Sequence, residues 1–277
     1  MPFAWSMLRN PEPTALAAAR ALAHRAVQWP TRAARANLPP AVDDSHSALT
    51  WDADRAALVS QPLKKGIRVG LRLGIHELVY IKDRNVESLS LVGVADAEMG
   101  RWLDQRLARD GLEPASGVKL PYELPPTLFG RPAEEGPALA TLAGWFAAGA
   151  EVLEEVRRKH AKRKPGPSPV RCWPHHFDIA VLVSLEKGDP EHAKSIGIGL
   201  SPGDDYYAQP YVYCCPNPKP GTEDLPTLPP GGRWHTRDFL GAVATATDLF
   251  ALPDPRKALV DVIDSATDEW LRRLDVR

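Results

Sequence analysis

The chain has 277 residues, and its 34 lysines and arginines balance 35 aspartates and glutamates, which leaves a formal net charge of -1. This balance produces no overall field that would attract nucleic acid or an anionic membrane surface, so we expect neither as a partner. The sequence contains no run of about 18 apolar residues that would cross a bilayer, and its first residues lack the basic and apolar regions of a signal peptide, so we expect a cytoplasmic protein.

The first half of the chain predicts a helix, a group of strands and a second helix. Strong helix formers follow Pro-Glu-Pro-Thr in 12–27, and large apolar residues recur about one turn apart in 97–109. Short apolar or alternating runs between them predict strands at 49–51, 56–60, 67–73 and 78–81. The third strand alternates, which places Arg68 and Arg72 on one face and its large apolar residues on the other.

The second half repeats this order. Apolar residues at helical spacing from Leu139 to Val156 predict a helix that ends in six lysines and arginines within 157–164. Cations at a helix C-terminus complement the helix dipole and need no nucleic-acid partner. Further strands are predicted at about 173–186, 195–201 and 209–215, followed by helices near 235–250 and 255–274.

Prolines cluster at 30–40, 121–137 and 216–230, which predicts connectors in place of helix or central strand. They divide the chain near residue 130, so we expect an N-terminal unit at 1–130 and a C-terminal unit at 131–277, or one integrated domain. Because strands are grouped and do not alternate singly with helices, the predicted fold class is α+β, with two pseudo-repeated helix-sheet-helix units whose antiparallel or mixed sheets share a core.

Several short segments of the second half are similar to a bacterial family called domain of unknown function 5996. They are Ser168-Pro-Val, Trp173, Phe177-Asp-Ile-Ala, Pro202-Gly203, Tyr211-Val-Tyr213 and the Trp270 helix. The resemblance is strongest over 168–217 and elsewhere extends only to the order of elements. Members of that family carry a His-Met-Trp-Thr-Gln-like motif on the first helix, where this chain has Ala23-His-Arg-Ala-Val-Gln-Trp29. The resemblance implies a shared fold and site position, and it implies no activity.

His176 and Asp178 are the candidate catalytic pair. If 173–185 forms one strand, these two side chains project to the same face. A histidine beside a carboxylate acts as a general base or as an oriented metal ligand. With Asp204 from the Ser-Pro-Gly-Asp-Asp loop and with His235, the pair would supply nitrogen and oxygen ligands for a divalent metal ion, the one cofactor these residues suggest. The spacing matches no established metal motif.

A structural interpretation competes with this one. The Trp-Pro-His-His segment at 173–176 equally fits a turn whose histidines bond to backbone, and Asp204 is suited to capping its own turn. The cysteines Cys172, Cys214 and Cys215 would contribute to a zinc site only in an irregular arrangement, so buried, inert thiols are favoured.

The expected binding pocket lies over the second sheet. Its predicted ligand-binding residues are Trp173, His175, Asp204, Tyr206, Tyr211 and Tyr213. We expect a soluble small-molecule-binding protein or an enzyme with this His/Asp/aromatic pocket, and metal-assisted hydrolysis is the reaction considered. The alternative is a non-catalytic protein-interaction module or a homodimeric structural protein, in which aromatic side chains form the partner surface.

Two further patterns are open to a binding interpretation. Gly197 and Gly199 share one face of a strand, which allows a helix, an aromatic ring or a ligand to approach closely. Arg68 and Arg72 share a strand face and have the geometry to clamp an anionic group, although a solvated sheet face is the favoured interpretation.

Overall fold

The structure is a computed structural model that describes residues 5–8, 13–124, 136–188 and 192–275. The chain forms two compact units. The first unit contains Thr14–Ala147 and Arg171–Phe177, and the second contains Met1–Pro13, Ala148–Val170 and Asp178–Arg277. The expected division near residue 130 lies outside the described residues.

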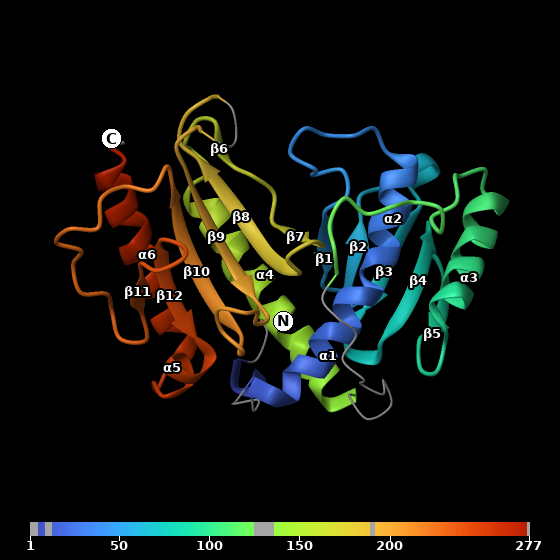
Figure 1. Cartoon of the computed structure of the whole chain (residues 1–277), viewed down its shortest axis with the longest axis horizontal. Helices are drawn as coiled ribbons and strands as arrows, with labels where there is room; N and C mark the ends of the chain where they lie inside the picture. The colour runs from blue at the N-terminus through green and yellow to red at the C-terminus, as the bar shows by residue number, and fades with distance from the viewer. Residues whose placement is uncertain (1–4, 9–12, 125–135, 189–191, 276–277) are drawn as a thin grey trace. The chain divides into compact units, whose positions relative to one another are not determined.

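The first unit is an antiparallel sheet with helices packed on it (Figure 1). Its helices are α1 (Pro13–Ala26), α2 (Gln28–Asn37), α3 (Asp96–Arg109) and the first part of α4 (Gly136–Lys159). Its strands lie in the order β7 (Arg171–Trp173), β1 (Leu49–Asp52), β2 (Ala57–Ser60), β3 (Arg68–Arg72), β4 (Glu77–Lys82) and β5 (Asn85–Ser90). Helix α2 packs on β2 and β3.

The alternation predicted around β3 is confirmed. Ile67, Val69 and Leu71 are fully buried, whereas Arg68 and Arg72 are only partly buried. Apolar side chains on one face of a strand remove their area from water when that face is covered, which is the main stabilising contribution to such a sheet.

Helix α2 was not expected, because proline was taken as a sign of a connector. Pro30 is the third residue of α2, and α2 follows α1 after Val27 alone. In the first turn of a helix the backbone N–H groups have no intrahelical acceptor, so proline costs little there. The prolines of 30–40 therefore bound this helix and do not exclude it.

The second unit is also an antiparallel sheet packed against helices. Its strands lie in the order β11 (Arg233–His235), β12 (Gly241–Thr245), β10 (Tyr211–Asn217), β9 (Ser195–Ser201) and β8 (Asp178–Ser184), and β6 (Gly166–Pro167) pairs with β8. Its helical segments are η1 (Trp5–Leu8), the second part of α4, α5 (Ala246–Phe250) and α6 (Pro255–Arg273). Helix α6 packs on β9, β10 and β12.

The two faces of this second sheet differ in chemistry. Val181 of β8 pairs with Ile198 of β9, which pairs with Cys214 of β10, and all three are buried on the face that α6 covers. Trp270 of α6 donates from Nε1 to the Cys214 carbonyl oxygen at 2.9 Å. The residues that alternate with these, including Gly199 and Tyr213, therefore lie on the opposite face of the sheet.

Two predicted elements are wrong in their extent. The strand expected over 173–186 is divided into β7 and β8 by a turn. The helix expected over 235–250 forms only at its end, as α5, because β12 occupies 241–245 and β11 ends at His235. The alanines of 241–245 favour a helix, but pairing of β12 with buried β10 overrides that weak preference.

The fold class is α+β, and every strand pairing described within the two units is antiparallel. The predicted duplication and shared core remain predictions. Among the described residues, no helix combines the length and apolarity needed to span a bilayer.

Candidate functional site

The predicted site residues fall into two groups, one in each unit. Trp173, His175 and His176 belong to the first unit. Asp178, Asp204, Tyr206, Tyr211, Tyr213 and His235 belong to the second.

The first group lies in a tight turn at 173–177. The Phe177 amide donates to the Trp173 carbonyl oxygen at 2.7 Å, and Phe177 adopts a φ of 58°, a left-handed conformation that is unusual for an aromatic residue. His176, in this turn, and Asp178, the first residue of β8, do not share a strand face as expected. The turn expected for Trp-Pro-His-His in the structural interpretation is confirmed, whereas the expected hydrogen bonds from its histidines to backbone stay a prediction.

Side chains from α1 and α2 hold this turn in place. The Nε2 atom of His24 bonds the Pro174 carbonyl oxygen at 2.9 Å, and Gln28 donates to the same oxygen at 2.8 Å. Tyr122 in turn donates to the Gln28 side-chain oxygen at 2.8 Å. The turn is therefore fixed by contacts from distant parts of the first unit.

Both His24 and His175 favour the neutral imidazole. Burial, above all, lowers the pKa of His24 to about 4, and Arg20 and His176 lower it further against the effect of the Pro174 hydrogen bond. Burial also lowers the pKa of His175 to about 4, with His176 as the next cause. Phe177 stacks on His24 with ring centroids 5.1 Å apart. The left-handed backbone conformation of Phe177 is therefore stabilised by stacking of its ring on the neutral imidazole of His24.

Sequence reasoning missed the roles of His24, Gln28 and Tyr122. His24 and Gln28 are four residues apart, the spacing that places two side chains on one helix face, and this was the available signal. No signal connected Tyr122 to them, because its contact spans 94 residues of sequence.

The second group forms a connected network on the sheet face away from α6. We call Asp178, Asp204, Tyr206, Tyr207, Tyr211, Tyr213, His235 and Phe239 the tyrosine-histidine cluster. Tyr211 and Tyr213 are two apart on β10, so both rings stand on this face, with centroids 6.3 Å apart. Tyr213 donates to an Asp178 carboxylate oxygen, and Tyr211 donates to Asp204 at 2.6 Å.

Both phenols remain protonated at neutral pH. Burial raises the pKa of Tyr211, and its hydrogen bond to Asp204 raises it further. Burial raises the pKa of Tyr213 well above its usual range, with the Asp178 charge as the second cause. Each hydroxyl therefore serves as a donor that fixes a carboxylate.

Asp204 organises its own loop. One carboxylate oxygen accepts from the amides of Tyr206 and Tyr207 at 2.9 and 3.1 Å, and the other accepts from Ser201 at 3.1 Å as well as from Tyr211. The predicted capping role of Asp204 is confirmed. With four donors on its two oxygens, Asp204 positions the tyrosines of the cluster.

His235 has a fixed ring, and one of its two nitrogens is without a hydrogen-bond partner in the part of the chain that the structure describes. Its Nδ1 atom lies 2.7 Å from the Tyr207 hydroxyl oxygen, and its ring stacks on Phe239 with centroids 3.9 Å apart. Tyr206 lies edge-on to the same imidazole at 6.3 Å and is 54% exposed. The Nε2 atom of His235 is buried and has no hydrogen-bond partner among the described residues.

Gly199 makes room for this network. A Cβ atom at Gly199 would collide with the Tyr213 ring and would lie 2.9 Å from the Ala180 side chain. At Gly197 the nearest atom to such a Cβ is 3.9 Å away. Of the two predicted close approaches, the one at Gly199 is made by an aromatic ring.

The predicted metal set is not assembled. Within the described ranges, no three histidine, cysteine, aspartate or glutamate side chains gather as metal ligands, so His176, Asp178, Asp204 and His235 form no such group. Instead, three of these side chains are hydrogen-bonded to tyrosine hydroxyls: Asp178 to Tyr213, Asp204 to Tyr211 and His235 to Tyr207.

Two of the three cysteines are buried, as expected, and Cys215 is half-buried. Cys172 and Cys214 are buried. Burial raises the pKa of Cys214 above its usual range and that of Cys215 to about 12, which keeps both sulfurs in the weakly nucleophilic thiol form at neutral pH.

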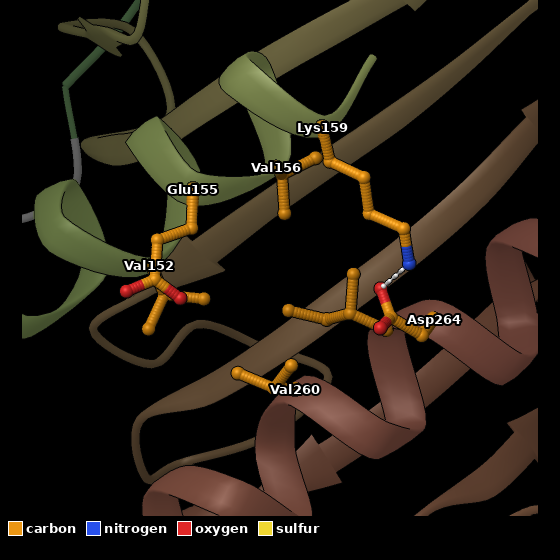
Figure 2. Close-up of a pocket in the computed structure, with 7 residues that line it drawn as sticks. Val152, Glu155, Val156, Lys159, Val260 and Asp264 are labelled. Carbon is orange, nitrogen blue, oxygen red and sulfur yellow. Dashed lines mark ion pairs between the residues drawn. The ribbon is translucent and has the colours of Figure 1, made fainter.

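A separate cavity of about 220 Å³ lies between α4 and α6 of the second unit. The cavity has apolar walls and a charged rim. Its lining residues are Val152, Glu155, Val156, Lys159, Val260, Ile263 and Asp264. Figure 2 shows Lys159 reaching across from α4 to Asp264 on α6, where the ion pair measures 2.7 Å. None of the predicted site residues lines this cavity.

Comparison with protein-family models, with curated proteins and with solved structures finds no match to the chain. The resemblance to domain of unknown function 5996 therefore stays an expectation from the sequence.

Proposed function

We propose that the second unit binds a small planar molecule that carries a hydrogen-bond acceptor, and that the tyrosine-histidine cluster is the binding site. The observation that carries this proposal is the Nε2 atom of His235, which lies within a group of aromatic rings and has no hydrogen-bond partner in the described ranges of the chain. A buried polar atom without a partner costs free energy, and a ligand that pairs with it recovers that cost.

The neighbours of His235 favour Nε2 as the donor. The guanidinium pKa of Arg233 is raised above its usual value. Burial alone would lower this pKa, but hydrogen bonding to Tyr207 and the charge of Asp248 together raise it by more. In the tautomer that we propose, the Tyr207 hydroxyl donates to the Nδ1 atom of His235. The proton of the neutral imidazole then resides on Nε2.

The rings around His235 favour a planar ligand. Tyr206 is exposed and lies 5.2 Å from Phe239 between ring centroids, so rotation of its side chain would open the approach to the imidazole. Aromatic side chains supply a large contact area and prefer stacked or edge-on partners. A planar molecule with a carbonyl oxygen satisfies both the rings and the donor.

Benzamide is a suitable first probe, because it combines a flat ring with a carbonyl acceptor, and cyclohexanecarboxamide is its non-planar control. In protein labelled with 15N at histidine, benzamide is expected to shift the Nε2 resonance of His235 along a saturable curve. His235→Phe keeps the ring and should abolish binding, whereas His192→Phe, an exposed histidine of the same unit, should not. Equal binding of benzamide by wild type and His235→Phe would contradict the proposal.

The interaction-module alternative is favoured by one observation, the exposure of Tyr206 at the edge of the cluster. Under that alternative Tyr206 contacts a second protein or a second copy of the chain. Sedimentation of wild type and Tyr206→Ser distinguishes the two functions. A dimer that Tyr206→Ser dissociates would favour the interaction module over ligand binding.

A further inference from the structure

The first unit contains a second open cavity, of about 410 Å³, on its sheet. It is formed by strand and turn residues around β1, β2, β3 and β4, among them Asp52, Arg55, Val59, Arg68, Ile81 and Asp83. None of these residues belongs to the tyrosine-histidine cluster.

Strand pairing explains why these residues meet. Thr50 lies opposite Val59, and Arg68 lies opposite Ile81. Asp83 follows Ile81 by two residues, in the turn between β4 and β5. Val59 and Ile81 are buried and form an apolar floor, and the polar groups stand around it.

The four charged groups of this cavity are not equivalent. Asp52 and Arg55 form an ion pair at 2.8 Å and so neutralise each other. Arg68 has only a 3.5 Å contact with the Ser60 carbonyl oxygen and no carboxylate partner in the part of the chain that the structure describes. Asp83 likewise has no cationic partner among those residues. The cavity therefore has one uncommitted cation and one uncommitted anion.

We infer that this cavity binds a small zwitterion of the amino-acid class, whose carboxylate pairs with Arg68 and whose ammonium group pairs with Asp83. A guanidinium binds a carboxylate through two parallel hydrogen bonds, which makes arginine well suited to this role. Because the site has no net charge, a zwitterion leaves no unpaired charge when it binds, whereas a simple anion leaves Asp83 without a partner. The methylene groups of the ligand contact the floor of Val59 and Ile81.

The geometry also separates Arg68 from Arg72. Arg72 is two residues further along β3, but its guanidinium is bonded to Glu77 at 2.7 Å and it does not line the cavity. Arg68 and Arg72 therefore do not form the anion clamp that their spacing suggests. Of the two, Arg68 is the one that binds the ligand carboxylate.

Titration calorimetry on the full chain tests this inference with glycine and 4-aminobutanoate as zwitterions of different length. Acetate and methylammonium are the singly charged controls. At least one zwitterion is expected to bind saturably, and Arg68→Gln and Asp83→Asn should each weaken it at least about tenfold, because each removes a charge-assisted hydrogen bond. Arg72→Gln and Asp54→Asn are matched controls outside the cavity, and they should bind as wild type does.

Three outcomes would overturn the inference. One is that no zwitterion binds to wild-type protein. A second is that acetate binds as tightly as the zwitterions and Asp83→Asn has no effect, which would make the site a simple anion site. The third is that Arg72→Gln weakens binding as much as Arg68→Gln does, which would indicate a general charge effect. Circular dichroism of each variant establishes that it is folded.

Discussion

The environment of His24 makes the stability of the first unit dependent on pH. The folded-state pKa of His24 is lowered from 6.5 to about 4, mainly by burial. Between these two values the unfolded chain binds a proton that the folded chain does not. The contribution of neutral His24 to the free energy of unfolding is therefore fully present above pH 6.5 and is lost as the pH falls toward 4. Proton binding by this one histidine lowers the free energy of unfolding by about 2 kcal/mol between pH 7 and pH 5, and by about 3 kcal/mol between pH 7 and pH 4.

Urea unfolding at pH 7 and pH 5 measures this loss, and His24→Gln isolates it. Glutamine does not titrate and keeps a side-chain amide that can donate to the Pro174 carbonyl oxygen. Groups that do not interact with His24 titrate equally in both proteins, so the difference between the two pH dependences belongs to His24 and to its effect on His175. We expect wild type to lose about 2 kcal/mol more than His24→Gln on this acidification. His192→Gln, at an exposed position of the second unit, is the control and should behave as wild type does.

An identical pH dependence in wild type and His24→Gln would refute the reasoning. A histidine NMR titration provides a second test that does not require the variant to fold. A His24 pKa at or above 6.5 in the native protein would show that the imidazole is charged readily, and that burial does not govern it.

Three substitutions test the second sheet. Gly199→Ala should destabilise the second unit by about 1–3 kcal/mol, since the new methyl group collides with an aromatic ring. Gly197→Ala places its methyl group no closer than 3.9 Å to a neighbouring atom and should be neutral or stabilising, so equal thermal unfolding of the two variants would contradict this. Val181→Asp should unfold the second unit, because it places a charge at a position only 1% exposed and costs several kcal/mol, whereas Leu182→Asp, at 37% exposure on the same strand, should be tolerated. A soluble Val181→Asp protein with an unchanged melting temperature would show that the strand register is wrong. Trp270→Phe should cost about 1–3 kcal/mol in urea unfolding, since it removes a buried donor and leaves a gap, and an unchanged midpoint would count against the hydrogen bond.

Periodicity alone determined much of the secondary structure. The strand around Val69 and the helix around Leu142 were predictable because each buries one face, and burial of one face leaves a period of two or of 3.6 residues in the sequence. Strands were likewise predicted at 195–201 and about 209–215, and β9 and β10 are found there, the second of them two residues further along the chain. These features depend on neighbours in sequence, which the pattern records.

Tertiary structure decided the features that depend on distant contacts. The turn at 173–177 interrupts a run that reads as continuous strand, and it is held by His24 and Gln28 from about 150 residues away. Pairing with β10 makes 241–245 a strand despite its alanines.

The same dependence on distant contacts explains the outcome for the candidate site. Its residue types were predictable, because histidine, aspartate and tyrosine are the residues that carry binding chemistry. Their partners were not, since a hydrogen bond such as that between Tyr207 and His235 depends on how a loop and a strand 28 residues apart come together. Composition and spacing constrain which groups are present. Only the packing of the chain determines which of them meet, which are paired and which, like Nε2 of His235, have no partner among the residues that the structure describes.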